Sequence, residues 1–244
     1  MKTYTKVILW MIGLALLILL IQYPLYKGQH MWRTIPMPLA GKTIVIDPGH
    51  GGPDGGAVGK DGTLEKDIAL NVAKNTRDYL QQAGALVYLT REEDEDLADK
   101  DTRGYSRRKS EDIRNRLKFI HEKEADFFIT IHLNSLPSSR WSGAQTFFYP
   151  RYPENKHLAT MIQEEIIRNL ENTNRVPLQM NDVYLLKHAE TPGALVEIGF
   201  LSNEEERKLL NDKKYQEKMA ASIYKGIIRY VVEDLEKNDD TSTD

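Results

Sequence analysis

Short β-branched runs alternate along the chain with longer stretches in which apolar residues recur every three or four positions. The short runs predict strands, and they lie at residues 43–47, 85–90, 126–132, 143–149, 183–186 and 194–198. The longer stretches predict helices, and they lie at residues 63–80, 113–124, 154–172 and 204–232. Because strands alternate with helices, we expect an α/β fold with a single twisted, mostly parallel sheet and helices on both faces.

A continuous apolar run opens the chain. Lys2 and Lys6 precede residues 7–21, which carry no charge, and this pattern is typical of an export signal. Bulky residues follow without a small-x-small cleavage site, so we expect residues 1–26 to form an uncleaved signal anchor in the membrane. The protein would then be exported and act outside the cytoplasm, either anchored or, if the segment is cleaved, secreted.

Composition divides the remainder of the chain. Residues 27–40 contain two prolines and predict a linker, residues 41–234 predict one domain, and the polar residues 235–244 predict a disordered tail. The formal net charge of -3 gives no reason to expect a nucleic-acid partner. The absence of cysteine fits an exported protein and a cytosolic one equally well.

Two histidines and two glutamates lie near the ends of predicted strands. In chain order they are His50, Glu65, His132 and Glu197. His50 and Glu65 follow the first predicted strand, His132 ends the third, and Glu197 lies in the sixth. Ligands of open α/β sheets bind at the carboxyl ends of the strands. A metal site at that edge of the sheet is therefore our first hypothesis.

The residue types favour zinc. Two neutral imidazoles and one carboxylate leave a fourth coordination position for water, as in catalytic zinc sites. A second glutamate that does not bind the metal can then take a proton from that water. Residues 49–62 are rich in glycine and can bend Glu65 toward His50, so we assign Glu65 with His50 and His132 as ligands and Glu197 as the base. Spacing alone does not separate the roles of the two glutamates.

Other interpretations compete with the metal site. The glycine-rich turn could be a phosphate cradle, but no Lys-Ser or Lys-Thr follows to hold a nucleotide. His132 alone would more often be a hydrogen-bonded core histidine. Glu197 is harder to dismiss, because a carboxylate between Val196 and Ile198 is costly if it is buried without a partner.

Taken together, these motifs resemble the zinc-dependent N-acetylmuramoyl-L-alanine amidases of bacterial cell walls. The similar blocks occur in the family's order at residues 47–57, 62–67, 125–135 and 192–203. The resemblance implies a zinc amidase domain over 41–234, with Zn²⁺ as cofactor and peptidoglycan as substrate. It gives His50, Glu65 and His132 the ligand role and Glu197 the acid/base role.

The resemblance also implies a reaction, the hydrolysis of the amide bond between N-acetylmuramic acid and L-alanine of the stem peptide. An anchor followed by a bare catalytic domain, together with residues 135–149, is most similar to the sporulation amidases that prepare spore-cortex peptidoglycan for muramic-δ-lactam formation. Because no wall-binding module is present, targeting would come from the membrane anchor or from a partner protein. Two alternatives stay open: a zinc peptidase acting on wall peptides, and a non-catalytic wall-binding or regulatory domain.

Four further residues are candidates for contact with the substrate: Asn134, His188, Arg107 and Arg108. Asn134 belongs to one of the similar blocks, and His188 lies in an apolar region near Glu197. The two arginines lie in the charged stretch 91–112, whose start we expect at the same sheet edge as the metal ligands. Such a stretch is usually a solvated loop, but arginine binds carboxylates such as those of stem peptides.

Overall fold

The structure of the protein is a computed structural model that describes residues 3–31 and 37–240. The chain divides into two compact units, Met1–Met37 and Pro38–Asp244. The first unit contains one helix and the second contains the whole sheet. The chemistry of the protein therefore lies in the second unit.

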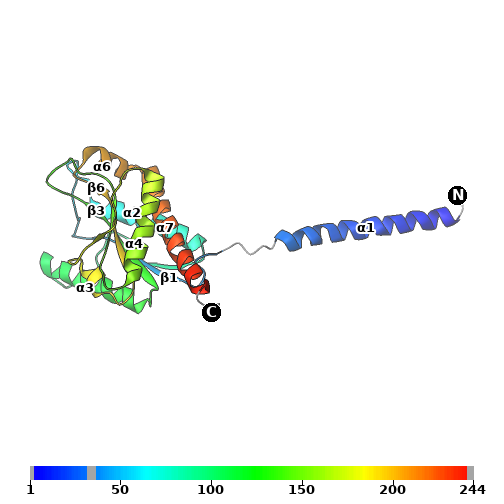
Figure 1. The fold of residues 1–244 in the computed structure, drawn as a ribbon, viewed down its shortest axis with the longest axis horizontal. Helices are drawn as coiled ribbons and strands as arrows, with labels where there is room; N and C mark the ends of the chain where they lie inside the picture. Colours follow the sequence, from blue (N-terminus) through cyan, green and yellow to red (C-terminus); the bar gives the residue numbers. More distant parts are fainter. Residues whose placement is uncertain (1–2, 32–36, 241–244) are drawn as a thin grey trace. The chain divides into compact units, whose positions relative to one another are not determined.

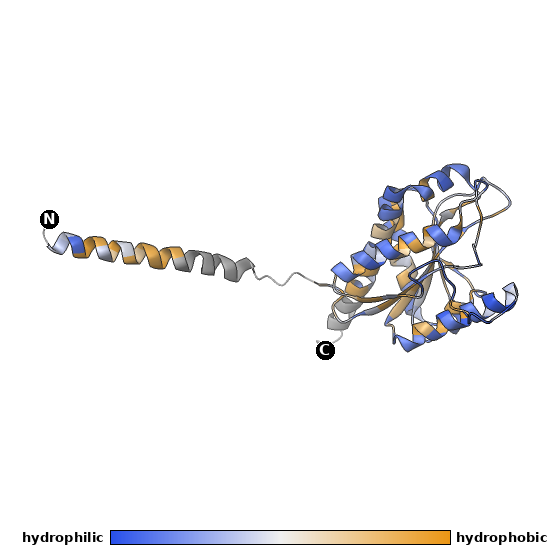
Figure 2. Cartoon of the chain, turned by 180° about the vertical axis from the view of Figure 1, so that it is seen from behind, coloured by the Kyte–Doolittle hydropathy of each residue, from blue (hydrophilic) through white to orange (hydrophobic). Residues whose placement is uncertain are grey.

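Helix α1, Thr3–Met31, makes up the first unit. Its residues Thr3–Leu20 are long and apolar enough to cross a membrane, and Figure 2 shows that hydrophobic positions dominate this part of the helix. A signal sequence passes the same test. The helix continues beyond the expected end of the anchor at residue 26, so the start of the expected linker is helical. Residues 32–36 of that linker lie outside the described residues.

The second unit is built on one six-stranded sheet in the order β2-β1-β3-β6-β4-β5. Its strands are β1 Thr43–Pro48, β2 Leu86–Leu89, β3 Phe127–Asn134, β4 Gln145–Phe148, β5 Leu178–Gln179 and β6 Gly193–Phe200. Every neighbouring pair is parallel except β4 and β6, which run antiparallel. The expected mostly parallel sheet is confirmed.

Helices cover both faces of the sheet, as the sequence predicted (Figure 1). They are α2 Glu65–Gln82, α3 Tyr105–Glu122, α4 Pro153–Leu170, α5 Tyr184–His188, α6 Glu204–Asn211 and α7 Lys213–Asp240. Side chains alternate across a strand, so Ile44 and Ile46 of β1 pack with α2, α4 and α7, whereas Val45 packs with α3 and α5. Each face therefore has its own apolar core.

The prediction of a strand at residues 183–186 was wrong, because these residues begin helix α5. A short apolar run cannot be assigned to a strand or a buried helical turn by its pattern alone. In the structure the run buries Leu185 and Leu186 against the sheet. The nearby strand β5 is only two residues long, and its pattern gave no signal.

Other element ends also differ from expectation. Helix α3 begins at Tyr105 rather than at residue 113, so Arg107 and Arg108 lie on a helix and not in a loop. The residue before α2 is Leu64 rather than Thr63, and no side chain caps the helix, but Glu65 does lie in the first turn. At the other end of the chain, α7 runs to Asp240 and so enters the expected tail 235–244. Residues 241–244 of that tail lie outside the described part of the chain.

Candidate metal centre

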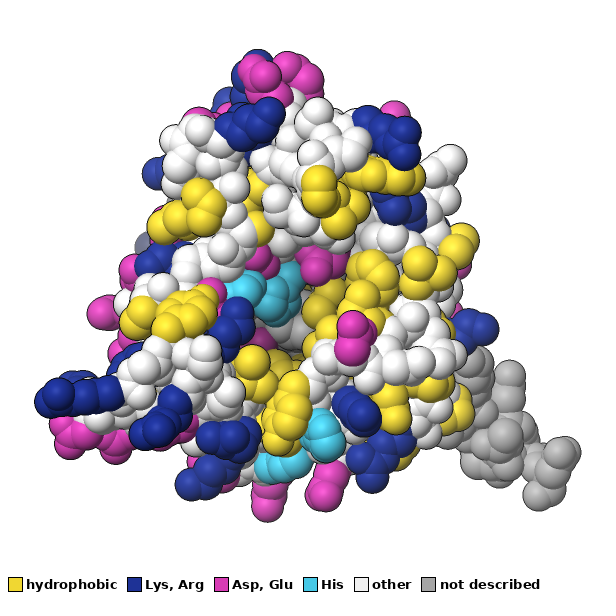
Figure 3. All heavy atoms as spheres, turned by 90° about the vertical axis from the view of Figure 1, so that its left-hand side faces the viewer, with side chains coloured by type: hydrophobic (Ala, Val, Ile, Leu, Met, Phe, Trp, Pro, Cys, Tyr) yellow, Lys and Arg dark blue, Asp and Glu magenta, His cyan; other side chains and the backbone are white. Residues whose placement is uncertain are grey.

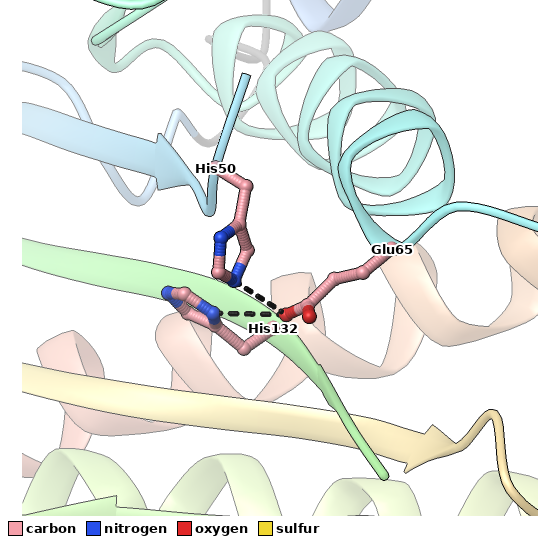
Figure 4. Close-up of side chains that lie close together, drawn as sticks. All are labelled: His50, Glu65 and His132. Carbon is pink, nitrogen blue, oxygen red and sulfur yellow. Dashed lines mark hydrogen bonds and ion pairs between the residues drawn. The ribbon is translucent and has the colours of Figure 1, made fainter. Parts of the chain in front are cut away.

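Three elements bring His50, Glu65 and His132 together at the carboxyl edge of the sheet (Figure 4). His50 follows β1, Glu65 is the first residue of α2, and His132 lies near the end of β3. Glu65 Oε1 lies 3.2 Å from His50 Nε2 and 3.0 Å from His132 Nδ1. One ligand atom from each residue lies within 4.8 Å of the other two. The structure therefore gathers the three residues that the sequence analysis assigned as ligands.

The Glu65 carboxylate is fixed by the backbone. Its Oε1 accepts a hydrogen bond from Leu133 N at 2.9 Å, and its Oε2 accepts one from Ala57 N at 2.7 Å. Burial raises the pKa of Glu65, but hydrogen bonds and charge from His132 and His50 hold that pKa well below its usual range. Glu65 is therefore an ionised carboxylate, the form that binds a metal ion.

Gly56 permits the close approach of two ligands. It has a φ of +68°, and an added Cβ would lie 2.6 Å from Glu65 Oε2 and from the His50 ring. Any side chain at this position would push the two ligands apart, besides straining the backbone. The glycine-rich stretch is therefore a device for packing His50 against Glu65.

His50 is itself held in a left-handed backbone conformation with a φ of 60°. Its carbonyl oxygen accepts a hydrogen bond from Arg116 Nη2 at 2.5 Å, and its Nδ1 lies 2.9 Å from Asp54 Oδ2. Burial lowers the pKa of His50, but hydrogen bonds to Asp54 and Glu65 raise that pKa to about 9 in the metal-free protein. A metal ion must therefore displace a proton from this cluster when it binds.

Two buried arginines support the turn that carries His50. Arg91 Nη2 donates to Gly49 O at 2.9 Å, and Arg91 Nε donates to Pro48 O at 3.1 Å. Arg116 Nη1 donates to Pro48 O and to Asp47 Oδ1, both at 2.8 Å. These charge-assisted hydrogen bonds fix the backbone of the turn that precedes His50.

Neither arginine was among the residues predicted from the sequence to support the site. A signal for Arg116 was present, because Asp112, Arg116 and Ile120 are spaced by four residues and so share one face of α3. A charged pair on an apolar helix face indicates a buried ion pair, and Arg116 Nε does lie 2.9 Å from Asp112 Oδ2. No comparable pattern marked Arg91.

Glu197 lies beside the cluster on β6, directly opposite His132 in the strand register. Its Oε2 is buried and has no hydrogen-bond partner among the described residues. Burial raises the pKa of Glu197 to about 7. The charges of His132 and His50 lower this pKa, and the charge of Glu65 raises it. A buried carboxyl without a partner, poised near neutral pH, has the properties of a general base.

A cavity of about 270 Å³ lies beside the two histidines. Figure 3 shows histidine side chains in a hollow between hydrophobic ones. The apolar wall of the cavity consists of Ile113 from α3 and Val183, Tyr184 and Leu185 at the start of α5. Lys109 also lines the cavity, and its Nζ lies 2.9 Å from Asp54 Oδ2. The apolar run that was expected to form a strand therefore builds a wall of the candidate active site.

The structure does not bring the four candidate substrate residues to this cavity. Arg107, Arg108, Asn134 and His188 are absent from its lining. Arg108 instead binds both carboxylate oxygens of Asp96, each at 2.6 Å. His188 is exposed, and its ring packs on Tyr184 with centroids 4.4 Å apart. Contact of these four residues with the substrate stays a prediction.

The chain matches known proteins over its second unit and beyond. Residues 44–229 match the family N-acetylmuramoyl-L-alanine amidase. The chain is 52% identical over 233 residues to the germination-specific N-acetylmuramoyl-L-alanine amidase of Bacillus subtilis (strain 168), which covers 96% of this chain and 98% of that protein.

Solved structures agree with this match. One is the CwlD amidase from Clostridioides difficile in complex with the GerS lipoprotein, with 43% identity, a TM-score of 0.77, and coverage of 78% of this chain and 98% of that one. Another is the catalytic domain of the amidase CwlV from Paenibacillus polymyxa, with 30% identity, a TM-score of 0.67, and coverage of 78% and 98%. The chain therefore belongs to the N-acetylmuramoyl-L-alanine amidases, a family of cell-wall hydrolases.

Proposed function

We propose that the second unit is a zinc amidase that releases stem peptides from the muramic acid of peptidoglycan. The bond cleaved is the amide between N-acetylmuramic acid and L-alanine. The observation that carries this proposal is the juxtaposition of the His50, Glu65 and His132 cluster with Glu197, whose Oε2 is buried and has no hydrogen-bond partner in the described part of the chain.

The cluster fits a zinc ion. Its donor atoms lie close enough to share one ion, since Glu65 Oε1 is 3.2 Å from His50 Nε2 and 3.0 Å from His132 Nδ1. Two imidazoles and one carboxylate are also the donor set of hydrolytic zinc sites, in which one position stays open. When bound, zinc would polarise the scissile carbonyl and lower the pKa of a water molecule to about 7.

Glu197 supplies the proton transfer. Its Oε2 takes a proton from the attacking water and then gives it to the nitrogen of L-alanine as the amide bond breaks. Burial raises the pKa of Glu197 to about 7 in the metal-free protein, and a carboxyl whose pKa is raised toward neutral pH is suited both to take and to give a proton. Because the proton passes from water to the leaving amine, Glu197 is returned to its starting state.

The cavity beside the cluster would hold the first residues of the stem peptide. Its volume of about 270 Å³ accommodates one or two residues but not a crosslinked network. The wall formed by Ile113, Tyr184 and Leu185 would exclude water from the scissile bond. The glycan strand would lie outside the cavity, so it would remain intact after the peptide leaves.

We also propose that the substrate is spore-cortex peptidoglycan. This is supported by 52% identity to a germination-specific amidase over nearly the full length of both chains. It can be tested by placing this chain in a Bacillus subtilis strain that lacks that relative. Return of stem-free muramic acid to the cortex, measured by mass spectrometry, is the expected result, and an unchanged cortex would contradict this assignment.

The location of the protein follows from the same comparison. A cell-wall amidase acts outside the cytoplasm, and we propose that α1 anchors this one to the membrane that faces the wall. The Clostridioides difficile relative was solved in complex with a lipoprotein. We propose a lipoprotein partner for this chain too, because both proteins would then be attached to a membrane surface.

Digestion of purified peptidoglycan tests the reaction itself. The products of the full chain are analysed by mass spectrometry, with a zinc-chelated sample as control. Release of whole stem peptides from muramic acid is the expected result. Cleavage within the stems would indicate a zinc peptidase, and an undigested wall that retains the protein would indicate a binding module, so either outcome contradicts the proposal.

A further inference from the structure

Asp54 collects four donors at the rim of the metal centre. Its Oδ2 lies 2.9 Å from His50 Nδ1 and 2.9 Å from Lys109 Nζ. Its Oδ1 accepts hydrogen bonds from Tyr105 Oη at 3.0 Å and from Gly56 N at 3.1 Å. Nothing in the proposed reaction uses this carboxylate, yet it joins the imidazole ring of His50 to Lys109 and Tyr105 of helix α3.

The bond between Asp54 and His50 decides which imidazole nitrogen is free. A carboxylate only accepts hydrogen bonds, so His50 Nδ1 must carry the proton that Asp54 receives. In a neutral imidazole the other nitrogen then has the lone pair. That nitrogen, Nε2, is the one that lies 3.2 Å from Glu65 Oε1 inside the cluster. The tautomer and the ring orientation are thus set from outside the cluster.

We propose that Asp54 is a positioning residue that acts through His50 to raise the affinity of the site for a divalent metal ion. The inference rests on the proposed metal centre. Carboxylates that accept the second N–H of a metal-binding histidine fix its orientation and make it a stronger donor, and their loss costs about 10–100-fold in metal affinity. Lys109 and Tyr105 hold the Asp54 carboxylate in place for this role.

A competing explanation is that Asp54 only fastens the glycine-rich turn to α3. The chain offers a matched control in Asp94, which fastens the same turn without touching a histidine. Asp94 Oδ1 accepts a hydrogen bond from Gly52 N at 2.9 Å, and its Oδ2 lies 2.7 Å from Lys66 Nζ. Replacing either aspartate by asparagine removes one negative charge near the turn. Only Asp54→Asn alters the group that accepts the hydrogen bond from His50 Nδ1.

The experiment measures the zinc dissociation constant of the full chain in detergent by competition with a chelator. Asp54→Asn should raise that constant by about 10–100-fold. Asp94→Asn should leave it unchanged, although the melting temperature of the chelated protein falls.

Two results would overturn the inference: a wild-type zinc constant in Asp54→Asn, or an equal loss of affinity in Asp54→Asn and Asp94→Asn. Failure of the metal centre itself has a different signature. In that case the wild type and His132→Ala would bind zinc equally well or equally poorly. The two failures are therefore distinguishable in one series of titrations.

Discussion

Replacing Arg116 by methionine should destabilise the protein strongly, because it leaves the buried carboxylates of Asp47 and Asp112 without their shared partner. Arg116 and Asp47 are 2% and 1% exposed, and the guanidinium lies 2.8 Å from Asp47 Oδ1. After the change, Asp47 keeps only the hydroxyl groups of Thr90 and Thr130 as side-chain donors. Breaking a buried ion pair by removing one partner costs about 3–5 kcal/mol. Methionine fills much of the same space, so the loss would report the charge rather than a cavity.

The loss should depend on pH, with a sign set by Asp47. In the wild type, burial raises the pKa of Asp47, but the charge of Arg116 and the two hydroxyls hold it below its usual range. That contribution to stability is present above the unfolded pKa and is lost as pH falls through the folded one. Without Arg116 burial dominates, and the pKa of Asp47 rises above its unfolded value. Protonation of Asp47 then stabilises the folded variant. The difference in free energy of unfolding between the wild type and Arg116→Met should therefore shrink as pH falls from neutral toward about 4.

Urea unfolding of the chelated full chain, followed by circular dichroism, measures both effects. Asp47→Asn combined with Arg116→Met is the matched control, since it removes one of the two unpaired charges, with Asp112 the other, and should be more stable than Arg116→Met alone. A loss below about 1 kcal/mol would place the pair among weak surface bridges. A loss that is the same at both pH values would refute the reasoning about Asp47.

The remaining predictions concern the metal ligands and the first helix. His132→Ala should lose zinc, because catalytic zinc keeps three protein ligands, whereas His188→Ala should retain it; metal analysis that finds the reverse would disprove the ligand set. Helix α1 should keep the protein in membranes after a high-salt wash, since salt screens charge without weakening apolar burial. A soluble protein whose N-terminus begins after Tyr23 would indicate a cleaved signal instead.

The sequence predicted the parts of this protein that follow from local pattern. Strands that alternate with helices place the residues after β1 and near the ends of β3 and β6 at one edge, so His50, His132 and Glu197 could be expected together. Placing Glu65 beside them required a further assumption, namely that the glycine-rich turn between β1 and α2 bends Glu65 toward His50. The structure supplies that bend through Gly56.

The support of the site was less visible in the sequence. The burial of Arg116 was indicated by its spacing from Asp112 on α3, but its contact with Asp47 spans 69 positions of sequence and leaves no local signal. Arg91 follows the strand β2 in a stretch of acidic residues, where an arginine is usually solvated, yet it is buried under the turn of His50. Prediction failed at Val183 to Leu185 for a different reason. A short apolar run has no period long enough to distinguish a strand from a helical turn.

Turnover of zinc-loaded Glu197→Gln shows whether Glu197 is the general base of the reaction. Glutamine keeps the shape of the side chain but cannot take the proton from water. We expect the variant to bind zinc with wild-type stoichiometry and to release stem peptides from purified peptidoglycan about 10²–10⁴-fold more slowly. Release at a near-wild-type rate from the zinc-loaded variant would contradict the account, because the only buried carboxyl beside the cluster without a partner among the described residues would then have no part in the reaction.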